Sequence, residues 1–227
     1  MIALALDTAT PQVGVALAGP DGPLASLQVR EGRRHGEVLA PAIETVCRLA
    51  GVTLADIDVL AVDVGPGLFT GLRVGISTAK ALADGLDTPA VGLTSTAILA
   101  AAHVDAGRPV VAVVDIRRGE VAWALYEPVG GAMVELSPPA RAAAAELCSL
   151  AKDLPAGVLA VGDGARRYAT DLGLEVAGPI ADHPSAAVLA GLGLDRAGIA
   201  GDASGLVPCY LREADVRIGW AQVPARD

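Results

Sequence analysis

Residues Val59 to Gly85 read VLAVDVGPGLFTGLRVGISTAKALADG, a sequence that predicts a strand, a tight turn and a helix. Its first six residues are mostly apolar and β-branched, as is typical of a buried strand. Gly65-Pro66-Gly67 ends that strand. Thr70 is a suitable N-cap for a following helix, because its hydroxyl can accept a hydrogen bond from a backbone N–H group. We expect the helix to end at Gly85, since glycine favours helix C-termini.

The predicted helix has two faces of different character. Four apolar residues recur at the spacing of one face and should pack on a sheet: Leu72, Ile76, Ala79 and Ala83. A second, mostly small face comprises Gly71, Gly75, Thr78 and Leu82. Glycine inside a helix costs about 1 kcal/mol relative to alanine, so two glycines spaced four apart favour the close approach of another helix. Alternatively, Gly71 belongs to the turn and Gly75 packs under a neighbouring loop.

A glycine-rich turn before a helix also invites a nucleotide-binding interpretation, because helix N-termini bind phosphate. The turn does not fit G-x-G-x-x-G, since Thr70 stands where the third glycine belongs, and no Lys-Ser/Thr pair follows as in a P-loop. Pro66 also removes one N–H group. A strand-to-helix turn without a ligand explains these residues equally well.

Composition limits the classes of function. The net charge of −9 argues against unaided nucleic-acid binding, which depends on cationic side chains. No apolar run reaches membrane-spanning length and no charged signal region precedes the first strand, so we expect a cytoplasmic protein without a membrane anchor. The three cysteines form no C-x-x-C and the three histidines no H-x-x-x-H, so we expect no metal site built by this chain.

The strand and helix pattern occurs twice. Val110 to Val114 followed by Asp115 matches the strand that ends at Asp7, and in both copies the next strand starts six residues after the aspartate. Val158 to Val161 repeats Val59 to Val62. We therefore predict a duplicated α/β fold of two domains, residues 1–106 and 107–227, with the partner-binding helices in the first.

Three further expectations concern the second half. An alanine-rich helix should run from Ala140 to Leu154, and Pro184 should open another that reaches about Leu194. The tail, from about residue 205 to 227, contains a short β-like segment from Tyr210 to Arg212. Its Trp220 could dock the tail on the first domain.

A series of motifs in fixed order suggests a family: LALDTAT, HGEVLAP, GPGLFTGLRVG, DIRRGEV, VGDGA and PCYLR. The duplicated plan, with an aspartate after the first strand of each half, resembles the actin, Hsp70 and sugar-kinase superfamily, which has a ribonuclease H-like fold. The motif series, which spans nearly the whole chain, resembles the TsaB family of bacterial tRNA threonylcarbamoyladenosine biosynthesis proteins.

This resemblance implies an accessory, non-catalytic subunit. It would pair with and activate the catalytic subunit TsaD, which forms N6-threonylcarbamoyladenosine at position 37 of tRNAs reading ANN codons. The ATPase TsaE would join the larger complex, tRNA would be met only through that complex, and a homodimer could form in isolation. The metal-binding histidines of TsaD align here with Ser95 and Leu99, so we expect no metal and no cofactor, apart from ATP or ADP at the interface with TsaD.

Two sets of site residues follow. The helix that begins at His35 should lie beside the helix after Gly67, and two such helices meeting the equivalent pair of a paralogue would give an interface with pseudo-two-fold symmetry. The predicted interface comprises His35, Glu37, Leu39, Gly71, Arg73, Val74, Gly75, Thr78 and Leu82. On this hypothesis Gly75→Leu leaves the chain folded but blocks pairing. A residual phosphate loop and a ligand-free Asx-type turn both explain Asp7, Thr8 and Thr10.

Two other classes of function compete with this one. A stand-alone ATP-dependent kinase or ATPase of the same superfamily would need a second phosphate loop, and the segment from Asp115 to Gly119 offers a single glycine. For Asp115 we favour an Asx-type turn. A peptidase would need a nucleophile or a metal, but the chain contains neither G-x-S-x-G nor H-E-x-x-H.

Overall fold

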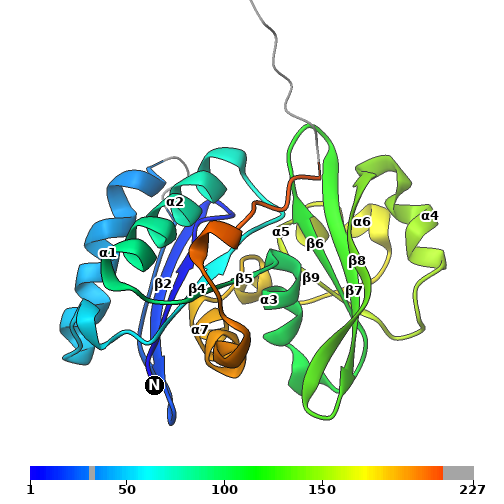
Figure 1. The fold of residues 1–227 in the computed structure, drawn as a ribbon. Helices are drawn as coiled ribbons and strands as arrows, with labels where there is room; N and C mark the ends of the chain where they lie inside the picture. The colour runs from blue at the N-terminus through cyan, green and yellow to red at the C-terminus, as the bar shows by residue number, and fades with distance from the viewer. Residues whose placement is uncertain (31–33, 212–227) are drawn as a thin grey trace, which may run out of the picture.

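Two lobes, each built on a five-stranded mixed sheet, make up the computed structural model, which describes residues 1–30 and 34–211 (Figure 1). The first sheet has the strand order β3-β2-β1-β4-β5, and the second has the order β10-β9-β6-β7-β8. The strands of the first are β1 (Ala3–Asp7), β2 (Gln12–Gly19), β3 (Gly22–Arg30), β4 (Val59–Asp63) and β5 (Ala90–Leu93). Those of the second are β6 (Val110–Asp115), β7 (Glu120–Val129), β8 (Ala132–Ala143), β9 (Leu159–Val161) and β10 (Glu175–Val176).

Helices connect and cover these sheets. The α-helices are α1 (His35–Ala50), α2 (Phe69–Leu86), α3 (Ser95–Ala101), α4 (Leu147–Lys152), α5 (Asp163–Arg167), α6 (Ala169–Leu172) and α7 (Ala186–Asp195). Short 3₁₀ turns are η1 (Leu54–Asp56), η2 (Val104–Ala106), η3 (Ala144–Glu146), η4 (Pro179–Ala181), η5 (Ala197–Ile199) and η6 (Ala203–Gly205). Of the helices in the described ranges, none combines the length and apolarity needed to cross a lipid bilayer.

The duplication predicted from the sequence is confirmed by strand pairing. In the first lobe β1 pairs antiparallel with β2 and parallel with β4. In the second lobe β6 pairs antiparallel with β7 and parallel with β9. Asp7 and Asp115 end equivalent strands, so each lobe brings an aspartate to the carboxyl edge of its sheet.

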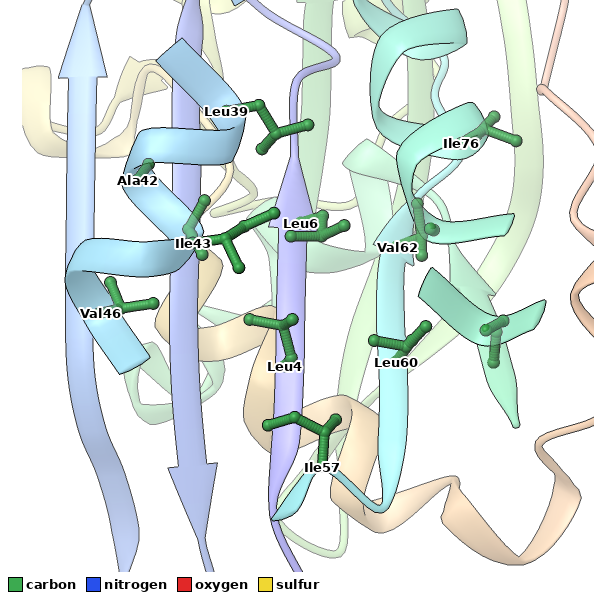
Figure 2. Close-up of a cluster of buried hydrophobic side chains, with 14 of the residues drawn as sticks. Leu4, Leu6, Leu39, Ala42, Ile43, Val46, Ile57, Leu60, Val62 and Ile76 are labelled. Carbon is green, nitrogen blue, oxygen red and sulfur yellow. The ribbon is translucent and has the colours of Figure 1, made fainter. Parts of the chain in front are cut away.

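Alternating large and small residues determine how the first sheet is covered. Leu4 and Leu6 alternate with Ala5 along β1, and Leu60 and Val62 alternate with Ala61 along β4. Because successive side chains of a strand point to opposite faces, one face carries the large side chains and the other the alanines. Figure 2 shows the large face meeting a stripe of α1: Leu39, Ala42, Ile43 and Val46. Ile76, Ala79 and Ala83 of α2 belong to the same core.

The alanine face of the first sheet is covered by α7, which comes from the end of the chain. Ala186, Leu189 and Ala190 pack there against alanines of β1, β2 and β4. Conversely, α3 follows β5 but packs on the second sheet, where Leu99 and Ala100 enter the core. The expected boundary after Ala106 therefore separates the strands of the two lobes but not their helices.

The boundaries of α2 differ from the sequence prediction. The helix begins at Phe69 with Leu68 as N-cap, and Thr70 does not cap it. It ends with Asp87 in the left-handed conformation, so Gly85 lies inside the helix. A leucine cap is tolerated because the Leu68 N–H donates to the Ala9 carbonyl, which fixes the chain just before the helix.

The helix predicted from Ala140 to Leu154 is wrong in its first part. Strand β8 continues to Ala143, because β7 pairs with it along that length, with Trp123 opposite Ala140 and Val121 opposite Ala142. Alanine favours helices only weakly against such tertiary pairing. Helix α4 then occupies only Leu147–Lys152. The helix expected after Pro184 is confirmed as α7.

Residues 200–211, here called the strap, run along α2 and reach both lobes. Gly201 exchanges backbone hydrogen bonds with Ala90 of the edge strand β5. Leu206 enters the core of the first lobe, whereas Leu211 packs against the core of the second. Tyr210 and Leu211 form no strand, contrary to expectation. The predicted contacts of Arg212 and Trp220 lie outside the described residues.

Candidate functional site

The three candidates for phosphate binding lie at the end of β1 and in the turn that follows it, and all three are buried. Asp7 Oδ1 accepts a hydrogen bond from the Ala9 N–H at 2.9 Å, which is the geometry of an Asx turn. Thr8 Oγ1 donates to the Gly71 carbonyl at 2.7 Å. The Thr10 carbonyl accepts from Nε2 of His35 at 2.8 Å. In this conformation the turn holds the beginnings of α1 and α2, and phosphate binding stays a prediction.

Gly71 and Gly75 of α2 face this turn, not a partner. A Cβ on Gly71 would lie 2.0 Å from the Thr8 carbonyl oxygen, and a Cβ on Gly75 would lie 2.4 Å from Thr8 Oγ1. The prediction that Gly71 and Gly75 offer a free face to another helix is therefore wrong. The alternative, in which Gly75 packs under a neighbouring loop, is confirmed. Gly75→Leu would disturb the fold itself and would not test an interface.

The other predicted interface residues fall into three groups, which are buried, exposed and half-buried. His35 and Leu39 are buried, the first against the turn and the second in the core, so neither offers surface to a partner. Glu37 and Arg73 are exposed. The remaining three are half-buried and lie between the core and the surface: Val74, Thr78 and Leu82.

An exposed aromatic pair at the start of α2 was not predicted. The Phe69 ring stacks on the Tyr210 ring of the strap, with centroids 5.2 Å apart. The guanidinium of Arg73 lies 4.0 Å from the Phe69 centroid, and its Nε donates to the Tyr210 hydroxyl at 3.2 Å. Phe69 is 45% exposed and Tyr210 is 42% exposed. Phe69 is the single phenylalanine of the chain, and its rarity was the one feature of the sequence that could have drawn attention to it. Its contact with Tyr210 could not be predicted, because that contact depends on tertiary structure.

The second-lobe aspartate forms ion pairs within its own lobe. Asp115 Oδ1 accepts from the Arg117 N–H at 2.8 Å, which confirms the Asx-type turn. Asp115 Oδ2 accepts from the guanidinium groups of Arg117 and Arg167 at 3.1 and 2.9 Å. The Asp115 N–H in turn donates to Asp163, and burial raises the pKa of the Asp163 carboxyl to about 6. The carboxylate of Asp115 therefore already has two cationic partners.

The two positions that align with metal ligands have structural roles. Ser95 Oγ donates to Asp63 Oδ1 at 2.7 Å, and the Leu99 side chain is buried in the second core. Within residues 1–30 and 34–211, His, Cys, Asp and Glu side chains form no group of three placed to hold a metal ion. Neither the Ser95 nor the Leu99 side chain is therefore placed to bind a metal ion.

Comparison with known proteins identifies the family. A family model described as TsaD, tRNA N6-adenosine threonylcarbamoyltransferase, matches residues 30–178. The tRNA threonylcarbamoyladenosine biosynthesis protein TsaB of Bacillus subtilis is 30% identical, over 98% of this chain and 99% of that protein. The chain belongs to the TsaB family. A solved structure of YeaZ from Pseudomonas aeruginosa superimposes on this TsaB-family chain with a TM-score of 0.82 and 28% identity, over 92% of this chain and 99% of that one.

The TsaB-family chain is also related to a transferase. A segment is 54% identical to the tRNA N6-adenosine threonylcarbamoyltransferase of Symbiobacterium thermophilum, over 27% of this chain and 18% of that protein. The pairing of its strands and the match to YeaZ together confirm the predicted duplicated α/β fold of two lobes. The family assignment rests on the whole chain, whereas the relation to the transferase rests on a part of it.

Proposed function

We propose that this chain is an accessory subunit in the formation of N6-threonylcarbamoyladenosine at position 37 of tRNAs that read ANN codons. It pairs with a TsaD-type transferase and activates it, and it does not itself transfer the threonylcarbamoyl group. The observation that carries the proposal is the similarity to a TsaB protein over the full length of both chains. We place the assembly in the cytoplasm and propose that it also includes a TsaE-type ATPase. This chain would meet tRNA only as part of that assembly.

Two structural features support a non-catalytic role. The residues that align with the metal ligands of the transferase family are Ser95, which is bound to Asp63, and Leu99, which is buried. The carboxylate at the end of β6, Asp115, is held by Arg117 and Arg167. A stand-alone kinase or ATPase would need such a carboxylate and the β1–β2 turn to be open to a nucleotide. Any ATP or ADP would instead bind where the chain meets the transferase.

The partner surface is revised by the structure. The outer sides of α1 and α2 remain the proposed contact, but the residues that can reach a partner are Glu37 on α1 and Phe69 and Arg73 on α2, with Tyr210 of the strap beside them. Aromatic and arginine side chains supply much of the binding energy at protein interfaces. A related transferase would present an equivalent pair of helices, and a second copy of this chain could use the same surface when the transferase is absent.

Reconstitution tests the proposal. The chain, a TsaD-type transferase and a TsaE-type ATPase are combined with tRNA, ATP and the threonylcarbamoyl donor, each protein being omitted in turn. We expect modified tRNA only when the chain and the transferase are both present. The chain alone should neither modify tRNA nor hydrolyse ATP at ~1 s⁻¹, a modest rate for an enzyme. Full modification without the chain, or ATP turnover by the chain alone, would contradict the proposal.

A further inference from the structure

Two aspartates lie side by side at the ends of neighbouring strands in the first lobe. The parallel register pairs Leu6 of β1 with Val62 of β4, so Asp7 and Asp63 are the next pair along the sheet. Paired residues of parallel strands point to the same face, with their backbones about 5 Å apart. Asp7 is 0% exposed and Asp63 is 1% exposed. Two carboxyl groups are therefore buried next to one another.

Each carboxyl group has one oxygen with partners and one without. Asp7 Oδ1 accepts from the Ala9 N–H, and Asp63 Oδ1 accepts from the Gly65 N–H at 2.8 Å and from Ser95 Oγ. Neither Oδ2 receives a hydrogen bond from an N–H or hydroxyl group of the described residues. A buried oxygen without a donor is costly, and a buried ionised carboxylate without one is more so. A single proton held between the two Oδ2 atoms would satisfy both.

Within residues 1–30 and 34–211, no lysine or arginine is among the groups that shift the pKa values of the two aspartates. The Ser95 hydroxyl of α3 donates to Asp63, and the charge of Asp63 acts on the Cys209 thiol of the strap. The His35 ring of α1 donates to Thr10, three residues after Asp7. Burial raises the pKa of both aspartates, and the charge of Asp63 raises that of Asp7 further. The influences that lower the two pKa values are hydrogen bonds, not lysine or arginine side chains.

The equivalent place in the second lobe differs. There the Asp115 N–H donates directly to Asp163 Oδ1, and the Asp115 carboxylate is bound by Arg117 and Arg167. In the second lobe Asp115 is buried and Asp163 is half-buried, so the two acidic pairs differ in burial as well as in partners. The second pair is held by cations and a backbone N–H group, whereas neither Oδ2 atom of the first pair has a donor.

We propose that Asp7 and Asp63 share one proton between their Oδ2 atoms, and that this proton joins the β1–β2 turn to the turn between β4 and α2. Asp7 is followed by Thr8, which binds the Gly71 carbonyl of α2, and Asp63 holds Gly65 in the turn that leads into α2. The shared proton therefore positions the start of α2. This inference does not depend on the proposed function, because it concerns the isolated chain.

The sign of the pH dependence follows from burial. The folded state holds the proton above pH 3.8, the ordinary value for an aspartate, whereas the unfolded state loses it there. Stability is therefore full below that pH and decreases as the pH rises towards the folded pKa values. For one proton the unfolding equilibrium constant increases by up to about tenfold per pH unit.

Two measurements on the isolated chain test the inference. Infrared spectroscopy at neutral pH should show the C=O band of a protonated, buried carboxylic acid in the unchanged chain. The band should be lost in Asp63→Asn and kept in Asp84→Asn, which changes an exposed aspartate of α2. Urea unfolding from pH 5 to 9 should give a smaller pH slope for Asp63→Asn than for the unchanged chain or Asp84→Asn, because the asparagine amide can donate to Asp7 at every pH.

Asp163, whose pKa is also raised, contributes equally to the slope of every variant and so cancels in the comparison. Absence of the protonated-acid band from the unchanged chain would overturn the inference, as would equal pH slopes for the unchanged chain and Asp63→Asn. Should Asp63→Asn fail to fold, infrared spectra of the unchanged chain with isotope-labelled aspartate decide alone.

Discussion

At Gly71 the space that a side chain would need is taken by the backbone of another element. The spacing of Gly71 and Gly75 correctly indicated that something approaches α2 closely. It could not indicate what, because the approaching residue, Thr8, lies 63 residues earlier than Gly71 in the chain. The aspartate at the end of β1 was likewise predicted as a site residue. Its neighbour Asp63 was missed, since their contact depends on the register of two parallel strands.

The backbone contact at Gly71 gives the first prediction. Gly71→Ala should lower the free energy of unfolding by about 1–3 kcal/mol or more, because a Cβ would overlap the Thr8 carbonyl and the backbone must move. Urea denaturation measures the change.

Gly85→Ala is the matched control for that substitution. Gly85 lies in the same helix, and a Cβ added there would meet no atom of another element within 4 Å. Alanine should therefore be neutral or should stabilise the chain by up to about 1 kcal/mol. Equal effects of the two substitutions would show that Gly71 does not lie against the β1–β2 turn.

At the scale of the element, strands with strong patterns were predictable and alanine-rich segments were not. The run from Val59 and its repeat from Val158 have β-branched, buried sequences, and both became strands. The segment from Ala140 favours a helix locally, but pairing with β7 extends β8 through it. The strap has neither periodicity nor propensity, so its course along α2 follows from tertiary contacts alone.

Those contacts give a prediction for the strap. Tyr210→Ala removes the stacking with Phe69 and the hydrogen bond from Arg73, and aromatic pairs contribute about 0.5–1.5 kcal/mol beyond buried area. Hydrogen exchange of the Cys209 amide, which is bonded to the Val64 carbonyl, should become roughly two- to tenfold faster, as that energy implies. Val207→Ala changes an exposed residue of the same strap and should leave the exchange rate unchanged. Similar acceleration in both variants would show that Tyr210 does not anchor the strap.

At the scale of the whole molecule, the lobes exchange helices. The sequence predicted the duplication because motifs repeat. It could not show that α7 covers the first sheet and α3 the second, because no feature of either helix sequence identifies the sheet on which it packs. We therefore expect that the linear division after Ala106 does not yield two units that fold independently.

A fragment of residues 1–106 tests this exchange. Without α7 the alanine face of the first sheet would be open to water, so the fragment should show no cooperative unfolding transition by circular dichroism. Adding a fragment of residues 107–227 should restore the transition. A cooperative transition of residues 1–106 alone would contradict the exchanged arrangement.

The affinity of this chain for a TsaD-type transferase tests whether the outer surface of α1 and α2 binds that partner. Titration calorimetry would compare the unchanged chain with Arg73→Glu, at the proposed contact, and Arg196→Glu, an exposed arginine that follows α7. We predict measurable binding of the unchanged chain and of Arg196→Glu. For Arg73→Glu we predict about 10- to 100-fold weaker binding, with an unaltered circular dichroism spectrum. Equal affinities of all three, or no binding of the unchanged chain, would contradict the account.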